Sequence, residues 1–343
     1  MHYRTLGNSG TVVSTYALGA MTFGKEADEA TSHAILNDYV EAGGNLIDTA
    51  DIYNNGLSEQ IIKSWLSKHP IEAEQVLIAT KARFPMGNGP NDLGTSRRHL
   101  HRSLDASLKR LGVEQIDLYQ MHSWDGITPL EETLRFLDDA IRNGKIAYYG
   151  FSNFTGWQLS KAVYLAKANG FSPPITLQPQ YNLLVREIEF EIVPACLDAK
   201  LGLLPWSPLA GGWLTGKYQR DVTPSGMTRL GQDPQRGMEA WEMRNKQERI
   251  WKIIDMVEKI AKSNQLSPAQ VSLAWLEAKP GVSSVILGVR NQSQLSHDLV
   301  AASVELSAQD LKSLDEVSTP VTSDYPYGQA GIDQRHRPID VNK

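Results

Sequence analysis

The sequence predicts an α/β protein built as a (β/α)₈ barrel, and three observations lead to this prediction. Short apolar runs alternate with amphipathic helical stretches eight times along the 343 residues. The hydrophobic content of 41% can bury a large core, and barrels of this class run from about 200 to more than 400 residues as one domain. Three of the runs also end in a charged or acid–base residue. We therefore expect a single domain over residues 1–343.

Eight runs have the length and composition of short buried strands. They lie at residues 17–20, 45–47, 76–80, 116–121, 147–149, 175–177, 202–204 and 284–287. Between them, helical patterns are clearest over residues 95–111, 129–141 and 186–199. The alternative is a doubly wound sheet, but no G-x-G-x-x-G follows any strand, and residues 87–92 lack the third glycine.

Three segments lie outside the eight strand–helix units, and the sequence predicts a structure for each of them. Residues 3–14 contain a turn between two strand-like runs, which predicts a hairpin that plugs the bottom of the barrel. Extra helices are expected toward the C-terminus. Residues 219–244 form a long polar stretch with several prolines and glycines after the seventh strand, and loops of this length are usually functional or disordered. As a functional loop, it would cover the mouth of the barrel.

Composition excludes several classes of function. The net charge is −5 without a long basic run, so we expect small-molecule partners and no nucleic acid. Cys196 is the only cysteine, which excludes an intramolecular disulfide. No apolar stretch of about 18 residues and no signal-peptide core is present, so we expect a cytoplasmic protein without membrane contact. Oligomeric state is not indicated by the sequence.

A metal site is not expected either. The sequence has no H-E-x-x-H, and His99 and His101 diverge by about 200° on a helix. Residues 211–217 match most of a phosphate-binding Walker A loop, but Tyr218 replaces the magnesium ligand and no helix pattern follows, which excludes a nucleoside triphosphatase.

Four acid–base residues form the candidate catalytic site. Asp48, Lys81 and His122 each follow a strand-like run, and Tyr53 lies five residues after Asp48. Residues just past the strand C-termini of a β/α barrel project into one mouth. Taken singly, each has an ordinary structural explanation such as a cap or a core aromatic. Together they predict a site, because an unpaired buried lysine or aspartate is strongly disfavoured.

The order and spacing of several motifs resemble those of the aldo-keto reductases over nearly the whole chain. The matching stretches are residues 44–53, Gly56-Leu57-Ser58-Glu59, Lys81, His122, Gly144-Lys145, Gly150-Phe151-Ser152-Asn153 and Trp206-Ser207-Pro208-Leu209. The resemblance implies a barrel that binds NADP(H) across its C-terminal face without a Rossmann fold and reduces aldehydes or ketones. It also assigns catalysis to the same four residues.

The chemistry of such a reduction agrees with those residues. Hydride delivery to a carbonyl carbon builds negative charge on its oxygen, so a proton donor must lie within hydrogen-bond reach. We assign Tyr53 as that donor. Lys81 favours the phenolate and eases proton release, Asp48 holds Lys81, and His122 donates a hydrogen bond to the carbonyl oxygen.

The resemblance also implies a cofactor set. Ser152, Asn153 and Gln178 would hydrogen-bond the nicotinamide carboxamide, and Trp206 would stack on its ring. Pyrophosphate contacts are expected after the seventh strand, and 2′-phosphate contacts at the helix start after the eighth. The remaining predicted cofactor residues are Gly19, Met21, Ser207, Leu209, Gly211, Lys217, Gly288, Arg290, Gln294 and Asp298. Arg290 favours NADP over NAD, with a surface ion pair as the alternative, and His297-Asp298 departs from the family's usual Glu-Asn.

Substrate identity is predicted only as a class. Phe23, Phe84 and Trp124 are expected to line an apolar mouth suited to aromatic or hydrophobic carbonyls. An alternative function is a cofactor-sensing regulatory subunit, because potassium-channel β subunits resemble the same family. A barrel isomerase or hydrolase, which would bind no cofactor, is a further alternative. The four intact acid–base residues favour an NADPH-dependent enzyme, working reversibly as an alcohol dehydrogenase.

Overall fold

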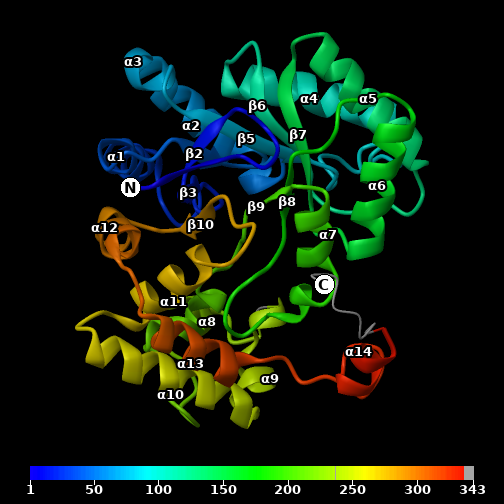
Figure 1. The fold of residues 1–343 in the computed structure, drawn as a ribbon. Helices are drawn as coiled ribbons and strands as arrows, with labels where there is room; N and C mark the ends of the chain where they lie inside the picture. Colours follow the sequence, from blue (N-terminus) through cyan, green and yellow to red (C-terminus); the bar gives the residue numbers. More distant parts are fainter. Residues whose placement is uncertain (236, 336–343) are drawn as a thin grey trace.

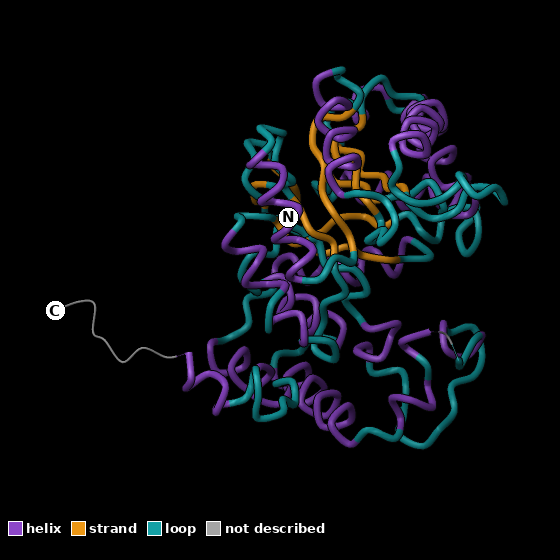
Figure 2. The backbone as a smooth tube through the Cα atoms, turned by 90° about the vertical axis from the view of Figure 1, so that its right-hand side faces the viewer, coloured by secondary structure: helices purple, strands orange, loops and turns teal. Residues whose placement is uncertain are grey.

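The computed structural model describes residues 1–235 and 237–335, and its centre is one sheet of eight parallel strands (Figures 1 and 2). The strands are β3 (Tyr16–Gly19), β4 (Leu46–Asp48), β5 (Leu77–Ala82), β6 (Ile116–Met121), β7 (Ile146–Ser152), β8 (Thr176–Gln178), β9 (Gly202–Leu203) and β10 (Val285–Gly288). They pair in that order, with β10 beside β3. All eight strands predicted from the sequence are confirmed.

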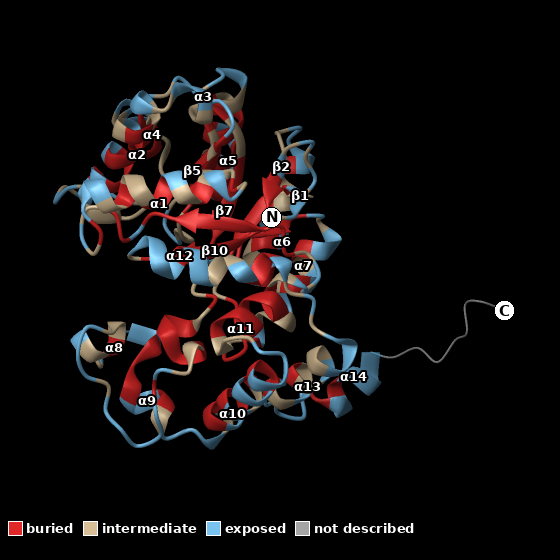
Figure 3. Cartoon of the chain, turned by 90° about the vertical axis from the view of Figure 1, so that its left-hand side faces the viewer, coloured by how far each residue is buried: buried red, intermediate tan, exposed pale blue. Residues whose placement is uncertain are grey.

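The sheet closes on itself between β9 and β10. The Leu203 amide donates to the Gly281 carbonyl at 2.8 Å, and the Ser283 amide donates back to Leu203 at 2.9 Å. The Ile286 amide then donates to Pro205 at 3.0 Å. The architecture is therefore the predicted (β/α)₈ barrel, and its strands are the most buried part of the molecule (Figure 3).

Helices cover the outside of the barrel and extend below it in the view of Figure 1. The α-helices are α1 (Glu29–Glu41), α2 (Leu57–Lys68), α3 (Pro70–Ala73), α4 (Arg97–Leu111), α5 (Leu130–Arg142), α6 (Gly156–Ala168), α7 (Ile192–Asp198), α8 (Arg229–Gln232), α9 (Trp241–Asn245), α10 (Glu248–Ser263), α11 (Pro268–Glu277), α12 (Gln292–Leu299), α13 (Ala308–Ser318) and α14 (Gln329–Arg335). The 3₁₀ helices are η1 (Tyr53–Gly56), η2 (Glu187–Glu189), η3 (Ala210–Thr215), η4 (Gly237–Glu239) and η5 (Val300–Ser303).

Local sequence signals explain where the helices begin and end. The Ser96 side chain accepts from the His99 amide at the start of α4, and Gly112, with φ of 69°, ends that helix. The predicted helices over residues 95–111 and 129–141 are confirmed within two residues. The prediction of one helix over residues 186–199 is wrong. The backbone breaks at Glu191 (φ −137°), because Pro194 lacks an amide donor and is tolerated only in the first turn of a new helix.

The predicted hairpin closes the bottom of the barrel. Strands β1 (Tyr3–Thr5) and β2 (Val12–Ser14) pair antiparallel, and Leu6 and Val13 pack against inward-facing barrel residues. Gly7 has φ of 56°, and a Cβ there would lie 2.0 Å from the Ile175 carbonyl oxygen. Only glycine fits this close approach, so the hairpin is fixed against the strand ends opposite the mouth.

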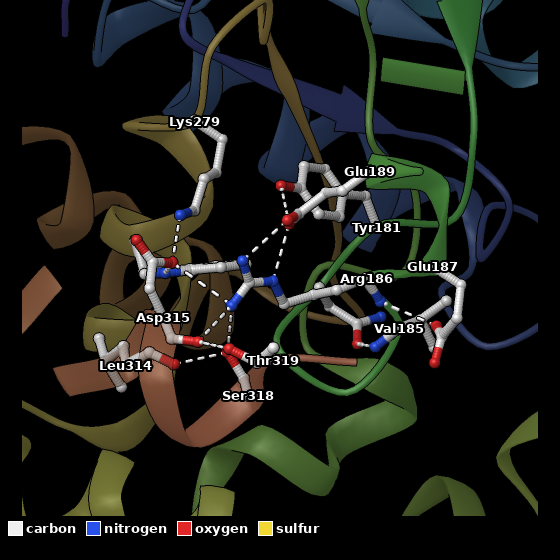
Figure 4. A network of polar contacts seen from close by, with 12 residues as sticks. Tyr181, Val185, Arg186, Glu187, Glu189, Lys279, Leu314, Asp315, Ser318 and Thr319 are labelled. Carbon is white, nitrogen blue, oxygen red and sulfur yellow. Dashed lines mark hydrogen bonds and ion pairs between the residues drawn. The ribbon is translucent and has the colours of Figure 1, made fainter. Parts of the chain in front are cut away.

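The C-terminal helices are fastened to the barrel through Arg186 (Figure 4). Its Nε pairs with Glu189 at 2.7 Å, and its Nη1 donates to the Asp315 carbonyl at 2.8 Å and the Ser318 hydroxyl at 2.7 Å in α13. The guanidinium is buried but fully paired, as a buried charge must be. The segment after β8 is thereby held against the extra helices that the sequence predicted. Within the described residues, no helix is long and apolar enough to cross a membrane.

Candidate active site

A cavity of about 960 Å³ opens at the C-terminal ends of the strands. Its walls include Gly19 of β3, Asp48 of β4, Ser152 of β7, Gln178 of β8 and Gly288 of β10. One end contains Tyr53 and His122, and the wall continues through the loop after β9 to Arg290 and Asp298. This is the face at which β/α barrels carry their active sites.

The predicted catalytic residues come together at one end of this cavity. Lys81 is fully buried, and its Nζ lies 2.6 Å from Asp48 Oδ2, 2.7 Å from the Thr49 carbonyl oxygen and 3.4 Å from the Tyr53 hydroxyl. The His122 ring lies edge-on to Tyr53, with centroids 5.8 Å apart. The register of the parallel strands produces this convergence, since β3, β4, β5 and β6 are direct neighbours.

Electrostatics keep both Lys81 and Tyr53 protonated. Burial disfavours the Lys81 ammonium, but Asp48 and Tyr53 outweigh burial and hold its pKa above the usual value. Burial raises the pKa of Tyr53, and the opposing effect of Lys81 is smaller. The sequence reasoning gave the direction of the Lys81 effect correctly but left out the larger effect of burial. Tyr53 therefore holds its proton at neutral pH and lies beside a cation that stabilises the phenolate after the proton leaves.

His122 is neutral in this environment. Burial, and then the charges of Lys81 and Arg83, hold its pKa well below the usual value. Its Nδ1 is buried and has no hydrogen-bond partner among the described residues. An unpaired buried acceptor is tolerated better than an unpaired N–H, which favours the tautomer with the proton on Nε2. The ring is held edge-on by Phe84, with centroids 4.7 Å apart.

Two glutamines orient Asp48. Its Oδ1 accepts from Gln178 Nε2 at 2.8 Å and from Gln120 Nε2 at 3.4 Å. Gln178 was predicted as a nicotinamide contact; it lines the cavity, but its amide nitrogen already donates to Asp48. Gln120 was missed by the sequence reasoning, and the available signal was a glutamine inside an apolar strand, opposite Lys81 in the register.

The other predicted nicotinamide contacts form a connected group. The Ser152 hydroxyl donates to the Gln178 carbonyl at 2.8 Å, and Asn153 Nδ2 donates to the His122 carbonyl at 2.9 Å. Trp206 Nε1 donates to Asn153 Oδ1 at 3.1 Å. The structure therefore brings these residues to the same cavity wall as the catalytic group.

The far end of the cavity is rich in cations. Lys217 and Arg290 lie there as predicted, together with Arg229, which the sequence reasoning missed. Burial lowers the pKa of Lys217, and the charges of Arg290 and Arg229 lower it further. Arg290 also forms an ion pair, which was the alternative role expected for it from the sequence. Its Nε lies 2.6 Å from Glu26 Oε2. Such an end suits an anionic ligand group.

All of the remaining predicted cofactor residues also line the cavity. Gln294 Oε1 accepts from the Arg290 amide at 2.9 Å. Asp298 pairs with His297 at 3.0 Å, and burial raises its pKa. The others that line it are Gly19, Met21, Ser207, Leu209, Gly211 and Gly288.

Of the three predicted substrate residues, one lines the cavity and two do not. Phe84 lines the cavity, whereas Phe23 is fully buried in the core and does not. Trp124 does not line it either, because its ring packs edge-on against Phe154 and Trp157, each with centroids 5.3 Å away. The loop after β9 instead contributes wall residues that sequence reasoning missed: Met227, Thr228, Arg229, Gly237, Met238 and Glu239. Among the described residues, no cluster of His, Cys, Asp or Glu is arranged to hold a metal ion.

Comparison with known proteins defines the class to which this barrel and site belong. The model of the aldo/keto reductase family matches residues 16–319, and the chain belongs to this family. The chain is 36% identical to the uncharacterized oxidoreductase YrpG of Bacillus subtilis (strain 168) over 92% of its length and 96% of that protein. It is 35% identical to a probable voltage-gated potassium channel subunit beta of Arabidopsis thaliana, covering 89% and 92% of the two chains. Identity to the versiconal hemiacetal acetate reductase of Aspergillus parasiticus is 32%, covering 93% and 98%.

Proposed function

We propose that this protein is an NADPH-dependent reductase of aldehydes or ketones, working in reverse as an alcohol dehydrogenase. The observation that carries the proposal is the contact chain from Asp48 through Lys81 to Tyr53, beside a neutral His122. Membership of an oxidoreductase family supports it. The cavity that starts at this group ends among Lys217, Arg229 and Arg290, which suits a long ligand with phosphate groups.

Each catalytic side chain has a role that follows from its geometry. NADPH, when bound, supplies the hydride. Tyr53 donates its phenolic proton to the carbonyl oxygen, and Lys81, 3.4 Å from that hydroxyl, stabilises the phenolate. His122, held neutral by burial, donates a hydrogen bond that orients the same oxygen. Asp48 keeps Lys81 charged and fixed in place.

The residues of the cavity wall fit the proposed cofactor. Ser152, Asn153 and Trp206 would hold the nicotinamide end. Ser207, Leu209, Gly211 and Lys217 would hold the diphosphate, and Gly288, Arg290, Gln294 and Asp298 the adenosine end, with Gly19 and Met21 beside the first strand. The fit rests on the cationic far end, where burial and then the charges of Arg290 and Arg229 lower the pKa of Lys217.

An apolar carbonyl compound is the proposed substrate. Phe84 packs on the ring of His122, and the half-exposed Met21 lines the same cavity. Such a surface binds aromatic or aliphatic groups through the hydrophobic effect and leaves the polar contacts to the catalytic group. A cytoplasmic location stays a prediction, with which the single buried thiol of Cys196 agrees.

A cofactor-sensing subunit is the second candidate, favoured by relatives described as probable potassium channel β subunits. The experiment that separates the two follows the loss of nicotinamide absorbance when NADPH is mixed with the protein and a panel of aromatic and aliphatic aldehydes. We expect turnover with apolar members of the panel. Tight NADPH binding without turnover of any aldehyde would favour the sensor, and no NADPH binding would refute both.

A further inference from the structure

A carboxylate from the long loop after β9 lies where the diphosphate of the proposed cofactor is expected. Glu239, the last residue of η4, lines the cavity and is only 8% exposed. The hydroxyl of Ser207 donates a hydrogen bond to its Oε1. Ser207 belongs to the wall that would hold the diphosphate, so its single hydroxyl proton is already in use.

The same carboxylate rests on the backbone of Gly211. A Cβ at that position would lie 2.0 Å from Glu239 Oε2, so a side chain there would displace the carboxylate. Ala210, Gly211 and Gly212 have φ values of 51°, 70° and 97°. The amides of Ala210 and Gly212 donate to the Ser207 and Leu209 carbonyl oxygens, each at 2.9 Å, so the turn that carries Gly211 is fixed by its own backbone hydrogen bonds.

The position of Glu239 is built into the packing of the loop. Trp213 Nε1 donates to the Glu239 carbonyl oxygen at 3.0 Å, and the Trp213 ring stacks on Trp241 with centroids 5.0 Å apart. Arg244 Nη1 donates to the Ala210 carbonyl oxygen at 3.2 Å. Contacts on both sides of η4 therefore hold the carboxylate against the cavity wall.

Glu239 adds a negative charge to a cavity whose wall also carries cations. Lys217, Arg229 and Arg290 line the same cavity. Of the other carboxylates that line the described part of the wall, Asp48 pairs with Lys81 and Asp298 with His297. Glu239 interacts through its charge with the buried Arg244. A diphosphate on Ser207 and Gly211 would meet the Glu239 carboxylate at contact distance, and two like charges there repel strongly.

We propose that Glu239 is a built-in competitor for the cofactor diphosphate. Its carboxylate occupies the position beside Ser207 and Gly211 until an incoming nucleotide displaces it. The inference rests on the proposed NADPH dependence. The loop after β9 would then set the affinity for the cofactor through one carboxylate. The diphosphate is the part of the nucleotide concerned, so the effect is specific to ligands that contain it.

The test is an NADPH titration of wild type, Glu239→Gln, Glu239→Ala and Glu242→Gln, followed by tryptophan fluorescence. Glu242 lies in the same loop and is exposed, so its substitution removes an equal charge away from the cavity. We expect both Glu239 variants to bind NADPH about tenfold more tightly, equivalent to about 1.4 kcal/mol, and Glu242→Gln to match wild type. Adenosine 2′-monophosphate, which lacks both phosphates of the diphosphate, should bind equally to all four proteins.

Two results would overturn the inference. If wild type binds NADPH and both Glu239 variants bind it equally or more weakly, Glu239 does not compete for the diphosphate, and the proposed function stands. If both variants tighten the binding of adenosine 2′-monophosphate as strongly as that of NADPH, the carboxylate acts through general charge and not at the diphosphate. Failure of all four proteins to bind NADPH would instead refute the proposed function.

Discussion

Replacing Arg290 with alanine should weaken the binding of NADPH and leave that of NADH nearly unchanged. Arg290 lines the cavity, and its Nη1 donates to the Met227 carbonyl oxygen at 3.1 Å. A hydrogen bond to a charged group contributes about 1.5 to 3 kcal/mol, which corresponds to about a 10- to 150-fold change in Kd. NADH lacks the 2′-phosphate, so its affinity does not depend on this contact.

Because Arg290 also forms an ion pair with Glu26, we expect the loss of NADPH affinity to lie toward the lower end of that range. Arg290 Nε lies 2.6 Å from Glu26 Oε2, and both side chains are about four-fifths covered. Glu26 thus uses part of the guanidinium's hydrogen-bonding capacity when no ligand is bound, and a 2′-phosphate must share the guanidinium with that carboxylate. For the same reason Glu26→Gln should strengthen NADPH binding, because the phosphate would then meet an arginine with no competing carboxylate from Glu26.

Calorimetric titrations of both cofactors at one ionic strength check this prediction. Arg290→Lys is the matched control, since it keeps the charge and loses the planar fork, and it should fall between wild type and Arg290→Ala. Equal losses for NADPH and NADH would show that Arg290 stabilises the fold around Glu26 and does not contact a phosphate. A wild-type preference for NADH would show that Asp298 dominates this end of the cavity.

Two further substitutions test the buried charges. Lys81→Met should lower carbonyl turnover by about 100-fold or more and move the pH profile, because Tyr53 loses the cation 3.4 Å from its hydroxyl; a wild-type rate with an unmoved profile would contradict this role. Asp51→Asn should raise stability at neutral pH. Burial, and then Glu59, raise the pKa of Asp51 from 3.8 to about 7, and neither carboxylate oxygen has a hydrogen-bond partner among the described residues. The folded state therefore holds a proton that the unfolded state releases, and wild-type stability falls as pH rises from about 4 to about 7, by up to about 4 kcal/mol. Chemical denaturation at several pH values measures the effect, and the same pH dependence in Asp51→Asn would show that Asp51 does not cause it.

The barrel and its catalytic group were predictable because they depend on local signals. A short apolar run ending in Asp48, Lys81 or His122 specifies both a buried strand and a residue at its C-terminal end. Parallel pairing then makes those ends neighbours whatever the intervening helices contain. The hairpin was predictable for a similar reason, since its turn and its two short runs are adjacent in sequence.

The parts that sequence reasoning missed depend on contacts between distant segments. Phe23 and Phe84 both follow strands, but only the packed structure shows that Phe23 is in the core and Phe84 in the cavity wall. The pairing of Arg290 with Glu26 joins residues from opposite ends of the chain. Arg229 and Glu239 belong to a polar loop without periodicity, in which no pattern indicates which side chain turns inward.

Whether Tyr53 donates the proton in carbonyl reduction is tested by the Tyr53→Phe variant. This change removes one hydroxyl and keeps the ring that packs against His122. Turnover of an accepted aldehyde should fall by about 100- to 10,000-fold, whereas the Kd for NADPH should stay within about twofold of wild type, because the phenol does not anchor the nucleotide. Near-normal turnover in Tyr53→Phe, with NADPH binding intact, would show that Tyr53 is not the proton donor.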